Sequence, residues 1–409
     1  MKEVIIIGGG ASGLISAIYA SKKGYNVTIL EKNKVLGKKI LLTGNGKCNY
    51  WNKSISLDNY NTDDKEKLNT ILSNNNQKEI QNLFDTLGII PKIRDNYYYP
   101  YSNQATSIQT ALIKECQINK VKIITECEVT DIKKDNDIFI IKTSNGLYKT
   151  KKIIISTGSL AYPKTGSTGD GYEFAKNLGH KIIKPLPALV QLISTGQFLK
   201  EWQGIRSDVS VTLKENNKIL KKEIGEIQLT DYGVSGICIF NLSSIASRKL
   251  SESKPISIEI NFLHPFSITE ENDFINWMNK RNNTMKGRTI SDLLDGVLNY
   301  KLINLILKLS NIKREDFWNN LDKEKKKLLA DYLTKFTLNI EGTKSFDNAQ
   351  TTTGGIPLQE INPNTMESTK CKDLYLTGEI LNADGNCGGY NLAFAWITGM
   401  LAGKGASND

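Results

Sequence analysis

The N-terminal segment constrains the fold of this chain more than any other stretch. Residues 4–7 (Val-Ile-Ile-Ile) form a run of β-branched apolar side chains, which is typical of a short strand buried on both faces of a parallel sheet. Glycines follow at once at Gly8, Gly10 and Gly13, in the spacing G-x-G-x-x-G. Apolar residues then recur at helical spacing, and residues 27–30 read as a second strand. This order predicts a βαβ unit with a glycine turn between its first strand and its helix.

Each glycine has a physical role in a dinucleotide site. Gly8 permits the tight turn, Gly10 lets the backbone approach a pyrophosphate, and Gly13 allows helix and strand to pack closely. The helix N-terminus offers unpaired N–H groups and a positive dipole end to the phosphates. Glu31 ends the second strand and can accept hydrogen bonds from ribose hydroxyls, which favours a ribose without a 2′-phosphate. A plain turn is the alternative, but the complete order of elements favours a dinucleotide site.

Length and composition favour a soluble, cytoplasmic protein of two or three domains. The chain has 409 residues, shows no apolar run of the ~20 residues that a membrane span needs, and starts in a strand without a signal-peptide pattern. Its six cysteines are scattered and it has two histidines. We therefore expect neither a disulfide framework nor a metal site.

The net charge of +10 leaves open a nucleic-acid, membrane or acidic partner. However, the lysines are spread along the chain, and the densest run, residues 323–327, reads as the solvated face of a helix. We expect a small-molecule substrate, no membrane partner and no nucleic-acid partner.

The middle of the first half contains further strands and loops. Short strands at 121–124, 129–132, 138–141 and 148–150 predict a small antiparallel insertion. The buried strand 152–155 then leads to Thr157 and Gly158, at the end of a strand where ligands bind in open α/β sheets. The glycine-rich residues 159–172 do not fit a second nucleotide site, because Pro163 and the long gap break the spacing.

An aromatic cluster, Tyr97-Tyr98-Tyr99-Pro100-Tyr101, precedes a predicted helix. Such a cluster usually serves packing, and a hinge or a pocket wall is the alternative. The sequence leaves this choice open.

The second half changes from strands to helices and back to a glycine-rich block. Alternating strands predict a β-rich insertion domain over 188–266. Ser267 and Glu270 fit a capping box that opens a helical domain over 267–340. Residues 341–409 return to glycine loops and end in an apolar helix over 392–402, with a return strand from the insertion near 341–355. The predicted fold class is α/β, with a Rossmann-like domain built from residues 1–187 and 341–409, an inserted β-rich domain and a nested helical domain.

Five ordered blocks together resemble the BaiN-type family of bacterial FAD-dependent oxidoreductases, which includes aminoacetone oxidases. The matching blocks are residues 7–31, 37–49, 157–171, 351–355 and 378–391. They run from one end of the chain to the other, so the resemblance covers its whole length. It implies FAD as the cofactor and an FAD domain made from both chain ends. The sequence departs from the usual family pattern at Lys47, where arginine is usual, and at Asn382, where aspartate is common.

The resemblance also implies which residues bind the cofactor. At the adenosine and pyrophosphate end they are Gly8, Gly10, Ala11, Ser12, Gly13, Glu31, Lys32, Val129, Thr157 and Gly158. A second loop follows the cofactor towards its ring with Lys38, Thr43, Gly44, Asn45, Gly46, Cys48 and Asn49. Around the ribityl chain and the isoalloxazine they are Gly378, Glu379, Asp384, Gly388, Gly389, Tyr390 and Asn391. Tyr162 and Tyr390 are the candidate catalytic residues, as members of the substrate pocket.

The expected function is that of an FAD-dependent oxidoreductase in which a small amine or related donor passes a hydride to flavin N5. Oxygen or another acceptor would then reoxidise the flavin. One alternative is an NAD(P)H-dependent reductase of an unsaturated or keto substrate, although a second nucleotide module is missing from the sequence. An alternative of another class is a flavin-bearing factor that binds or modifies RNA, which the positive charge would suit.

Overall fold

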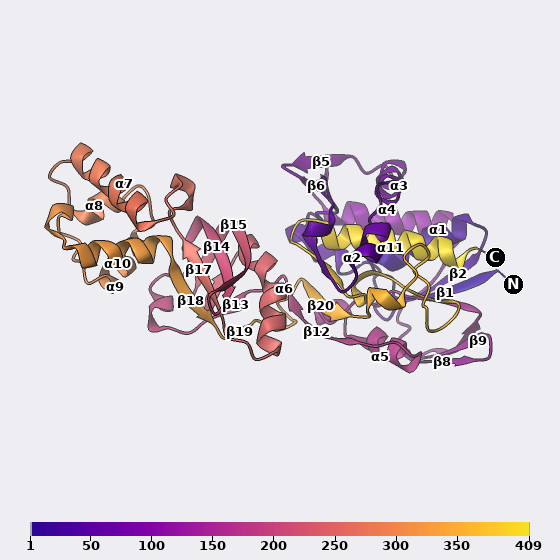
Figure 1. The fold of residues 1–409 in the computed structure, drawn as a ribbon. Coiled ribbons are helices and arrows are strands. Elements are labelled where there is room, and N and C mark those ends of the chain that lie inside the picture. Colours follow the sequence, from indigo (N-terminus) through magenta and orange to yellow (C-terminus); the bar gives the residue numbers. More distant parts are fainter. Residues whose placement is uncertain (1, 409) are drawn as a thin grey trace. The chain divides into compact units, whose positions relative to one another are not determined.

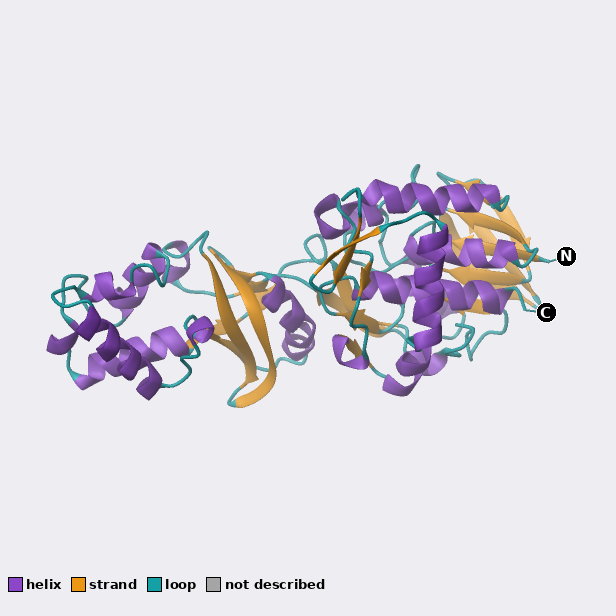
Figure 2. Cartoon of the chain, turned by 90° about the horizontal axis from the view of Figure 1, so that it is seen from above, coloured by secondary structure: helices purple, strands orange, loops and turns teal. Residues whose placement is uncertain are grey.

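The computed structural model describes residues 2–408 and divides them into two compact units (Figure 1). The first unit contains the residues up to Pro187 and those from Phe346 onward. The second unit is the intervening segment, Ala188–Ser345. Both units mix helices and strands (Figure 2).

A five-stranded parallel sheet forms the centre of the first unit. Its order is β21 (Leu374–Leu376), β11 (Lys152–Ile155), β1 (Glu3–Ile7), β2 (Asn26–Leu30) and β7 (Lys122–Ile124). All four neighbouring pairs are parallel, with Ile7 opposite both Ile155 and Leu30. Because β21 comes from the C-terminal part of the chain, both chain ends build one Rossmann-type domain, which confirms the predicted fold class.

Two helices from opposite ends of the chain pack against each other in this unit, α1 (Ala11–Lys22) and α11 (Tyr390–Ala406) (Figure 1). Glycines allow the close approach: a Cβ placed on Gly403 would lie 2.5 Å from the carbonyl oxygen of Ser16. The Ser16 hydroxyl donates to the carbonyl oxygen of Gly399 at 2.9 Å. The C-terminal helix is therefore an integral layer of the N-terminal βαβ unit.

Smaller elements surround this core. The other helices of the first unit are α2 (Lys65–Ile71), α3 (Asn74–Thr86), α4 (Ala105–Ile118) and α5 (Asp170–Asn177). The smaller sheets are β8 (Val129–Asp135), β9 (Ile138–Thr143) and β10 (Gly146–Thr150); β3 (Trp51–Asn52), β6 (Tyr97–Pro100) and β5 (Pro91–Arg94); β4 (Tyr60–Thr62) with β22 (Ala383–Gly385); and β12 (Ile183–Ala188) with β20 (Thr351–Gly355).

The sequence predicts the strand at 121–124 as part of the antiparallel insertion, and this prediction is wrong. The antiparallel insertion contains β8, β9 and β10, whereas β7 joins the parallel sheet beside β2, with Thr28 opposite Lys122. A three-residue strand has too little periodicity to reveal its partner, so the sequence could not distinguish the two positions.

The second unit is a seven-stranded sheet with helices. Its strand order is β18 (Phe336–Ile340), β17 (Ile256–Asn261), β14 (Arg206–Glu215), β15 (Lys218–Thr230), β16 (Gly233–Ser235), β13 (Leu192–Ile193) and β19 (Gly342–Thr343). Its helices are α6 (Ile237–Ser251), α7 (Glu271–Thr284), α8 (Ile290–Leu294), α9 (Tyr300–Leu309) and α10 (Lys323–Thr334). Helices α7 to α10 gather at one end of the sheet (Figure 1). One hydrophobic cluster runs through strands and helices, so the β-rich and helical segments share a core within one compact unit.

The capping box predicted at Ser267 is wrong. Ser267 has a left-handed backbone (φ 58°) and ends a short 3-10 turn over His264–Phe266, so it cannot open a helix there. Helix α7 starts one turn later, at Glu271. The structure instead forms a capping box at Thr289, whose side chain and backbone N–H bond reciprocally with Asp292 at the start of α8.

Within residues 2–408, no helix is long and apolar enough to cross a membrane. The same described residues contain no group of three or more His, Cys, Asp and Glu side chains that could hold a metal ion.

A buried histidine ties the end of α5 to the C-terminal part of the first unit. His180 Nδ1 lies 2.9 Å from Glu360 Oε2, and His180 Nε2 lies 2.7 Å from Ser368 Oγ. Ser368 Oγ already accepts hydrogen bonds from the backbone N–H groups of Lys370 and Cys371. Both of its lone pairs are then occupied, so the Ser368 hydroxyl donates to Nε2, and a neutral His180 donates from Nδ1 to Glu360.

We predict that this network makes the stability of the first unit sensitive to acid. Burial lowers the pKa of His180 below its usual value of 6.5, so the unfolded chain binds the proton more readily than the folded chain. The contribution of His180 to the free energy of unfolding is complete above pH 6.5. It is lost as the pH falls from there through the folded-state pKa. Urea unfolding at about pH 7.5 and about pH 5.5 would measure the loss, with His180→Gln as the variant that cannot titrate. An equal pH dependence in both proteins would contradict this assignment.

Candidate functional site

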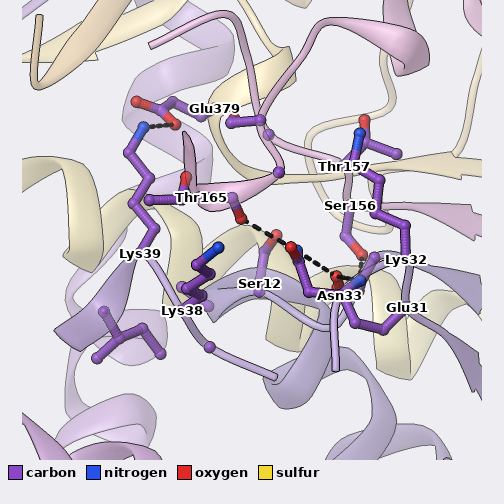
Figure 3. A pocket seen from close by; sticks show the side chains of 18 of the residues that line it. Ser12, Glu31, Lys32, Asn33, Lys38, Lys39, Ser156, Thr157, Thr165 and Glu379 are labelled. Atoms are coloured by element: carbon purple, nitrogen blue, oxygen red, sulfur yellow. Dashed lines mark hydrogen bonds and ion pairs between the residues drawn. The ribbon is translucent and has the colours of Figure 1, made fainter. Parts of the chain in front are cut away.

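A deep cleft opens in the first unit at the carboxyl ends of β1, β2 and β11 (Figure 3). It encloses about 1170 Å³ of space, including the part that opens to solvent, which is enough for a dinucleotide-sized ligand. Its walls are Ile7, Gly8, Gly10, Ala11, Ser12, Leu30, Glu31, Lys32, Asn33, Val35, Gly37, Lys38, Lys39, Ile40, Thr43, Cys127, Val129, Ser156, Thr157, Gly158, Thr165, Gly166, Ser167, Asp170, Phe174, Gln350, Glu379, Asn391, Leu392 and Ala395. The position matches the rule that open α/β sheets bind ligands beyond the carboxyl ends of their strands.

The glycine turn shapes the floor of this cleft. Gly8 has a positive φ of 99°, and a Cβ there would lie 2.6 Å from the carbonyl oxygen of Ser156. A Cβ on Gly13 would lie 2.1 Å from the carbonyl oxygen of Gly8, so helix α1 can approach β1 only because Gly13 has no side chain. Gly10 differs from both. Among the described residues, no atom lies within 4 Å of its ideal Cβ position, so Gly10 faces open space in the cleft.

The N-terminus of α1 points its backbone donors towards this space. Gly10 is the N-cap, and no side chain among residues 2–408 caps the helix there. The first intrahelical bond shown is from Leu14 N to Gly10 O, at 3.0 Å. The N–H groups at the start of the helix lack intrahelical acceptors, and together with the helix dipole they favour an anionic group in front of Gly10.

Glu31 is held rigidly beside the glycine turn. It is 7% exposed, its Oε2 accepts from Gly9 N at 2.8 Å, and its Oε1 accepts from the backbone N of Asn33 at 2.8 Å. The Asn33 side-chain amide also donates to Glu31 Oε1 at 2.7 Å and to the carbonyl oxygen of Thr165 at 3.1 Å. Asn33 thus orients the carboxylate and links it to the opposite wall, while Glu31 Oε2 keeps acceptor capacity for a ligand hydroxyl.

Thr157 offers a direct test of whether the cleft fits a polar ligand. Its Oγ1 is buried and has no hydrogen-bond partner within residues 2–408, although Thr157 lines the cleft. A buried hydroxyl without a partner is unfavourable, and a polar group bound in the cleft would satisfy it. The free helix N-terminus, the open space at Gly10 and the unpaired Thr157 hydroxyl together fit the phosphates and hydroxyls of a dinucleotide.

Three lysines border the cleft with different partners (Figure 3). Lys32 pairs with Asp170 at 2.5 Å, and Lys39 pairs with Glu379 at 2.6 Å. The Lys38 ammonium donates to the carbonyl oxygen of Lys164 at 2.7 Å and has no carboxylate partner within the described chain. Lys38 therefore keeps its positive charge available to an anionic ligand.

The structure brings many of the predicted cofactor residues to the cleft. Those that line it are Gly8, Gly10, Ala11, Ser12, Glu31, Lys32, Lys38, Thr43, Val129, Thr157, Gly158, Glu379 and Asn391. The others do not line it: Gly13, Gly44, Asn45, Gly46, Cys48, Asn49, Gly378, Asp384, Gly388, Gly389 and Tyr390.

Several of the residues that do not line the cleft have clear structural partners. Burial raises the pKa of the Cys48 thiol to about 12, so Cys48 is a neutral packing residue. Asp384 accepts from the Asn61 amide at 2.9 Å. A Cβ on Gly389 would lie 2.6 Å from the carbonyl oxygen of Trp51. These residues shape the loops that carry Thr43 and Asn391 into the cleft.

The two tyrosines predicted as catalytic do not line this cleft. Tyr162 has a left-handed backbone (φ 59°), and its N–H donates to the carbonyl oxygen of Phe346 at 3.0 Å. Tyr390 is 8% exposed at the first turn of α11, and burial raises the pKa of its phenol above the usual value of 10. A role for either side chain remains a prediction.

Several residues of the walls were not predicted from the sequence. Asn33 could have been suspected from its position two residues after Glu31, and Lys39 from its position beside Lys38. Thr165, Gly166, Ser167 and Asp170 belong to the loop that did not fit a second nucleotide site, and they complete the wall of the same cleft.

Comparisons with known proteins agree with a Rossmann-type fold. A family model described as "HI0933-like protein Rossmann domain" matches residues 2–405. The chain is 36% identical over 413 residues to a 3-dehydro-bile acid delta(4,6)-reductase of Clostridium scindens, covering 100% of this chain and 99% of the relative. It is 28% identical to a ribosomal RNA dihydrouridine synthase of Haemophilus influenzae, covering 96% of each chain.

Solved structures share the fold at low sequence identity. A flavocytochrome c3 fumarate reductase has a TM-score of 0.51 and 15% identity, covering 99% of this chain and 78% of that one. The 3-ketosteroid-delta4-(5alpha)-dehydrogenase of Rhodococcus jostii RHA1 has a TM-score of 0.50 and 13% identity, covering 100% of this chain and 97% of that one. These likenesses support the fold.

We predict that Gly10→Val prevents loading with the FAD expected from the sequence without unfolding the protein. Its side chain would fill the ligand space and meet no described protein atom within 4 Å at its Cβ. We expect FAD affinity to fall at least tenfold, about 1.4 kcal/mol, as measured by the flavin absorbance that remains after desalting. The flavin-stripped variant should unfold at the same urea concentration as the flavin-stripped parent. A yellow, fully loaded variant would contradict this placement.

We predict that Asn33 and Gly166 are energetically coupled. A Cβ on Gly166 would lie 2.3 Å from Asn33 Nδ2, so Gly166→Ala must displace the amide that orients Glu31. Asn33→Ala removes that amide directly, and each single variant should weaken FAD binding roughly tenfold. In the double variant the added methyl group finds space, so the loss should be smaller than the sum of the two single losses.

Fluorescence titration of the stripped proteins with FAD would measure this cycle. The backbone strain at Gly166 (φ 96°) is present with and without Asn33 and cancels in the comparison. Additive losses would show that Asn33 does not act through this contact.

Proposed function

The chain belongs to the HI0933-like Rossmann-domain family and is a BaiN-type FAD-dependent oxidoreductase, and from this premise we propose that it reduces a carbon–carbon double bond conjugated to a carbonyl group. We propose a cyclic small molecule of the steroid kind as substrate. The observation that carries this proposal is the full-length similarity to a 3-dehydro-bile acid delta(4,6)-reductase. A 3-oxo group beside 4,6-unsaturation, as that name states, is a conjugated cyclic enone.

A second relative supports the same bond chemistry. Dihydrouridine is uridine whose ring double bond, conjugated to a carbonyl group, has been reduced, and the Haemophilus influenzae relative is named for its synthesis. Both names describe reductions. The oxidation of a small amine, which was expected from the sequence, finds no counterpart among these names, and the reductase alternative replaces it as our proposal.

The residues of the cleft would bind and orient the cofactor. FAD, when bound, supplies the two-electron chemistry. Gly10 and the first N–H groups of α1 would hold the pyrophosphate, and Lys38 would balance its charge. Glu31, fixed by Gly9 N and Asn33, would accept hydrogen bonds from the ribose.

The other end of the cleft is suited to stabilise negative charge. Helix α11 is 17 residues long, and its N-terminal residues Asn391 and Leu392 line the cleft. Its unpaired N–H groups and dipole favour an electron-rich group there. The remaining residues implied by the resemblance, from Gly44 to Asn49 and from Gly378 to Tyr390, would shape the loops around that group.

A reduction needs a two-electron donor. We propose NADH or NADPH in this role, bound transiently, because the sequence supplies one dinucleotide fingerprint, which FAD would occupy. Two electrons and one proton from NAD(P)H, with a second proton from a protein group or water, balance the saturation of one double bond.

A uracil ring in RNA is the second candidate substrate. It is favoured by the 28% identity to the ribosomal RNA dihydrouridine synthase over 96% of each chain, together with the net charge of +10. Binding to RNA through phosphates would weaken steeply with salt, whereas binding of a steroid would not.

We predict that NADH or NADPH bleaches the flavin band of the purified protein under anaerobic conditions. A 3-oxo steroid with 4,6-unsaturation should then restore the yellow colour without oxygen, with one double bond reduced per flavin oxidised. Stopped-flow absorbance and mass analysis of the product would follow both halves of the reaction.

The substrate candidates separate in the second half of this experiment. Reoxidation by uridine-containing RNA at low salt, but not by the steroid, would favour the second candidate. Bleaching by small amines, with peroxide formed on admitting air and no reoxidation by any enone, would overturn the reductase proposal.

A further inference from the structure

The tyrosines of β6 point to two different sides. Side chains alternate along a strand, so Tyr97 and Tyr99 share one face and Tyr98 has the other. Tyr98 packs edge-on against Tyr50, with ring centroids 6.3 Å apart and planes at 88°. Because Tyr50 is buried, Tyr98 is the member of this cluster that serves the core. Packing therefore accounts for Tyr98 and leaves the opposite face to be explained.

That opposite face lies against the two glycine loops at one end of the cleft. A Cβ on Gly388 would lie 2.5 Å from Cε1 of Tyr97, and a Cβ on Gly44 would lie 3.4 Å from Cε1 of Tyr99. Gly388 stands just before α11, whose residues Asn391 and Leu392 line the cleft, and Gly44 follows Thr43, which also lines it. The two rings therefore lie against chain segments whose neighbouring residues, Thr43 and Asn391, line the cleft.

The rings are accessible and the Tyr99 hydroxyl is neutral near pH 7. Tyr97 and Tyr99 are both partly exposed. Burial and the neighbouring Cys387 raise the pKa of Tyr99, and the opposing effect of Arg94 is smaller. A neutral phenol presents a flat apolar ring and an O–H donor side by side.

We propose that Tyr97 and Tyr99 form the binding face for the planar, conjugated ring of the substrate, with ring stacking and a phenol hydrogen bond to its carbonyl oxygen. This proposal rests on the proposed function and names residues that recognise its substrate class. Stacking suits a flat enone because both partners have π-faces. A hydrogen bond to the carbonyl oxygen selects a conjugated ketone or amide over a plain alkene.

The same face would accept a steroid enone or a uracil ring, since both combine a planar conjugated ring with a carbonyl oxygen. Cyclohexenone contains only these shared features and is therefore the first probe. Uridine and a 3-oxo steroid with 4,6-unsaturation then distinguish the two sources of the ring.

The test compares ring and hydroxyl removal on the FAD-loaded protein. Titration with cyclohexenone, followed by the visible spectrum of the bound flavin, should give a dissociation constant for the parent. Replacing both rings, Tyr97→Leu with Tyr99→Leu, should raise that constant at least tenfold, with an unchanged flavin content. The double variant Tyr97→Phe with Tyr99→Phe keeps both rings. It should lose less affinity for cyclohexenone than the leucine pair does.

Tyr101→Leu is the matched control. Tyr101 lies just beyond the same strand, is 67% exposed and has the Lys92 ammonium over its ring. The Tyr101→Leu variant should bind the probe like the parent. The substrate KM should follow the dissociation constant in each variant.

Each outcome decides the proposal. Equal binding by the leucine pair and the parent would overturn it while leaving the reductase function intact. Loss of FAD from the leucine pair would also overturn it, because the tyrosines would then support the cofactor. A parent protein that neither binds any of the three probes nor is reoxidised by them would overturn both this proposal and the proposed function.

Discussion

The close approach of helix α1 to strand β1 is the constraint on which the rest of the structure depends. It exists because Gly13 has no side chain: a Cβ there would lie 2.1 Å from the carbonyl oxygen of Gly8. The Ser156 hydroxyl bonds to the carbonyl oxygens of Ile7 and Gly8 at 2.9 and 2.8 Å, which attaches β11 to the same turn. The floor of the cleft, the direction of the helix N-terminus and the position of Thr157 all follow from this contact.

The same principle brings the far end of the chain to the site. Helix α11 reaches α1 through Gly399 and Gly403, where the backbones approach closely and Ser16 donates across the interface. Once α11 is fixed in this way, its N-terminus stands at the cleft with Asn391 and Leu392 in the wall. Two helix N-termini therefore serve one ligand-sized space, and both depend on glycines that allow close packing.

Buried carboxylates in the first unit are satisfied by specific donors. Glu31 is held by Gly9 N and Asn33, and Glu360 by His180 and the backbone N of Lys181. Glu379, which is only partly buried, is paired with Lys39. A buried charge is costly unless it is paired and hydrogen-bonded, so each carboxylate determines the position of the segments that provide its donors. This explains why the loop containing Thr165 is fixed against the residues that follow β2.

The sequence by itself determined the features that depend on short-range order. The strand, glycine turn, helix and acid of residues 4–31 were sufficient to predict a Rossmann-type dinucleotide site, and the C-terminal glycine block was sufficient to predict that both chain ends build that domain. The tertiary structure decided the features that depend on contacts between distant segments: the partner of β7, the clamp from Asn33 to Thr165, the pairing of Lys39 with Glu379, and the placement of Tyr97 and Tyr99 against Gly388 and Gly44. The physical reason is that turns and helix starts are specified by a few neighbouring residues, whereas the walls of a cleft are specified by which chain segments packing brings together.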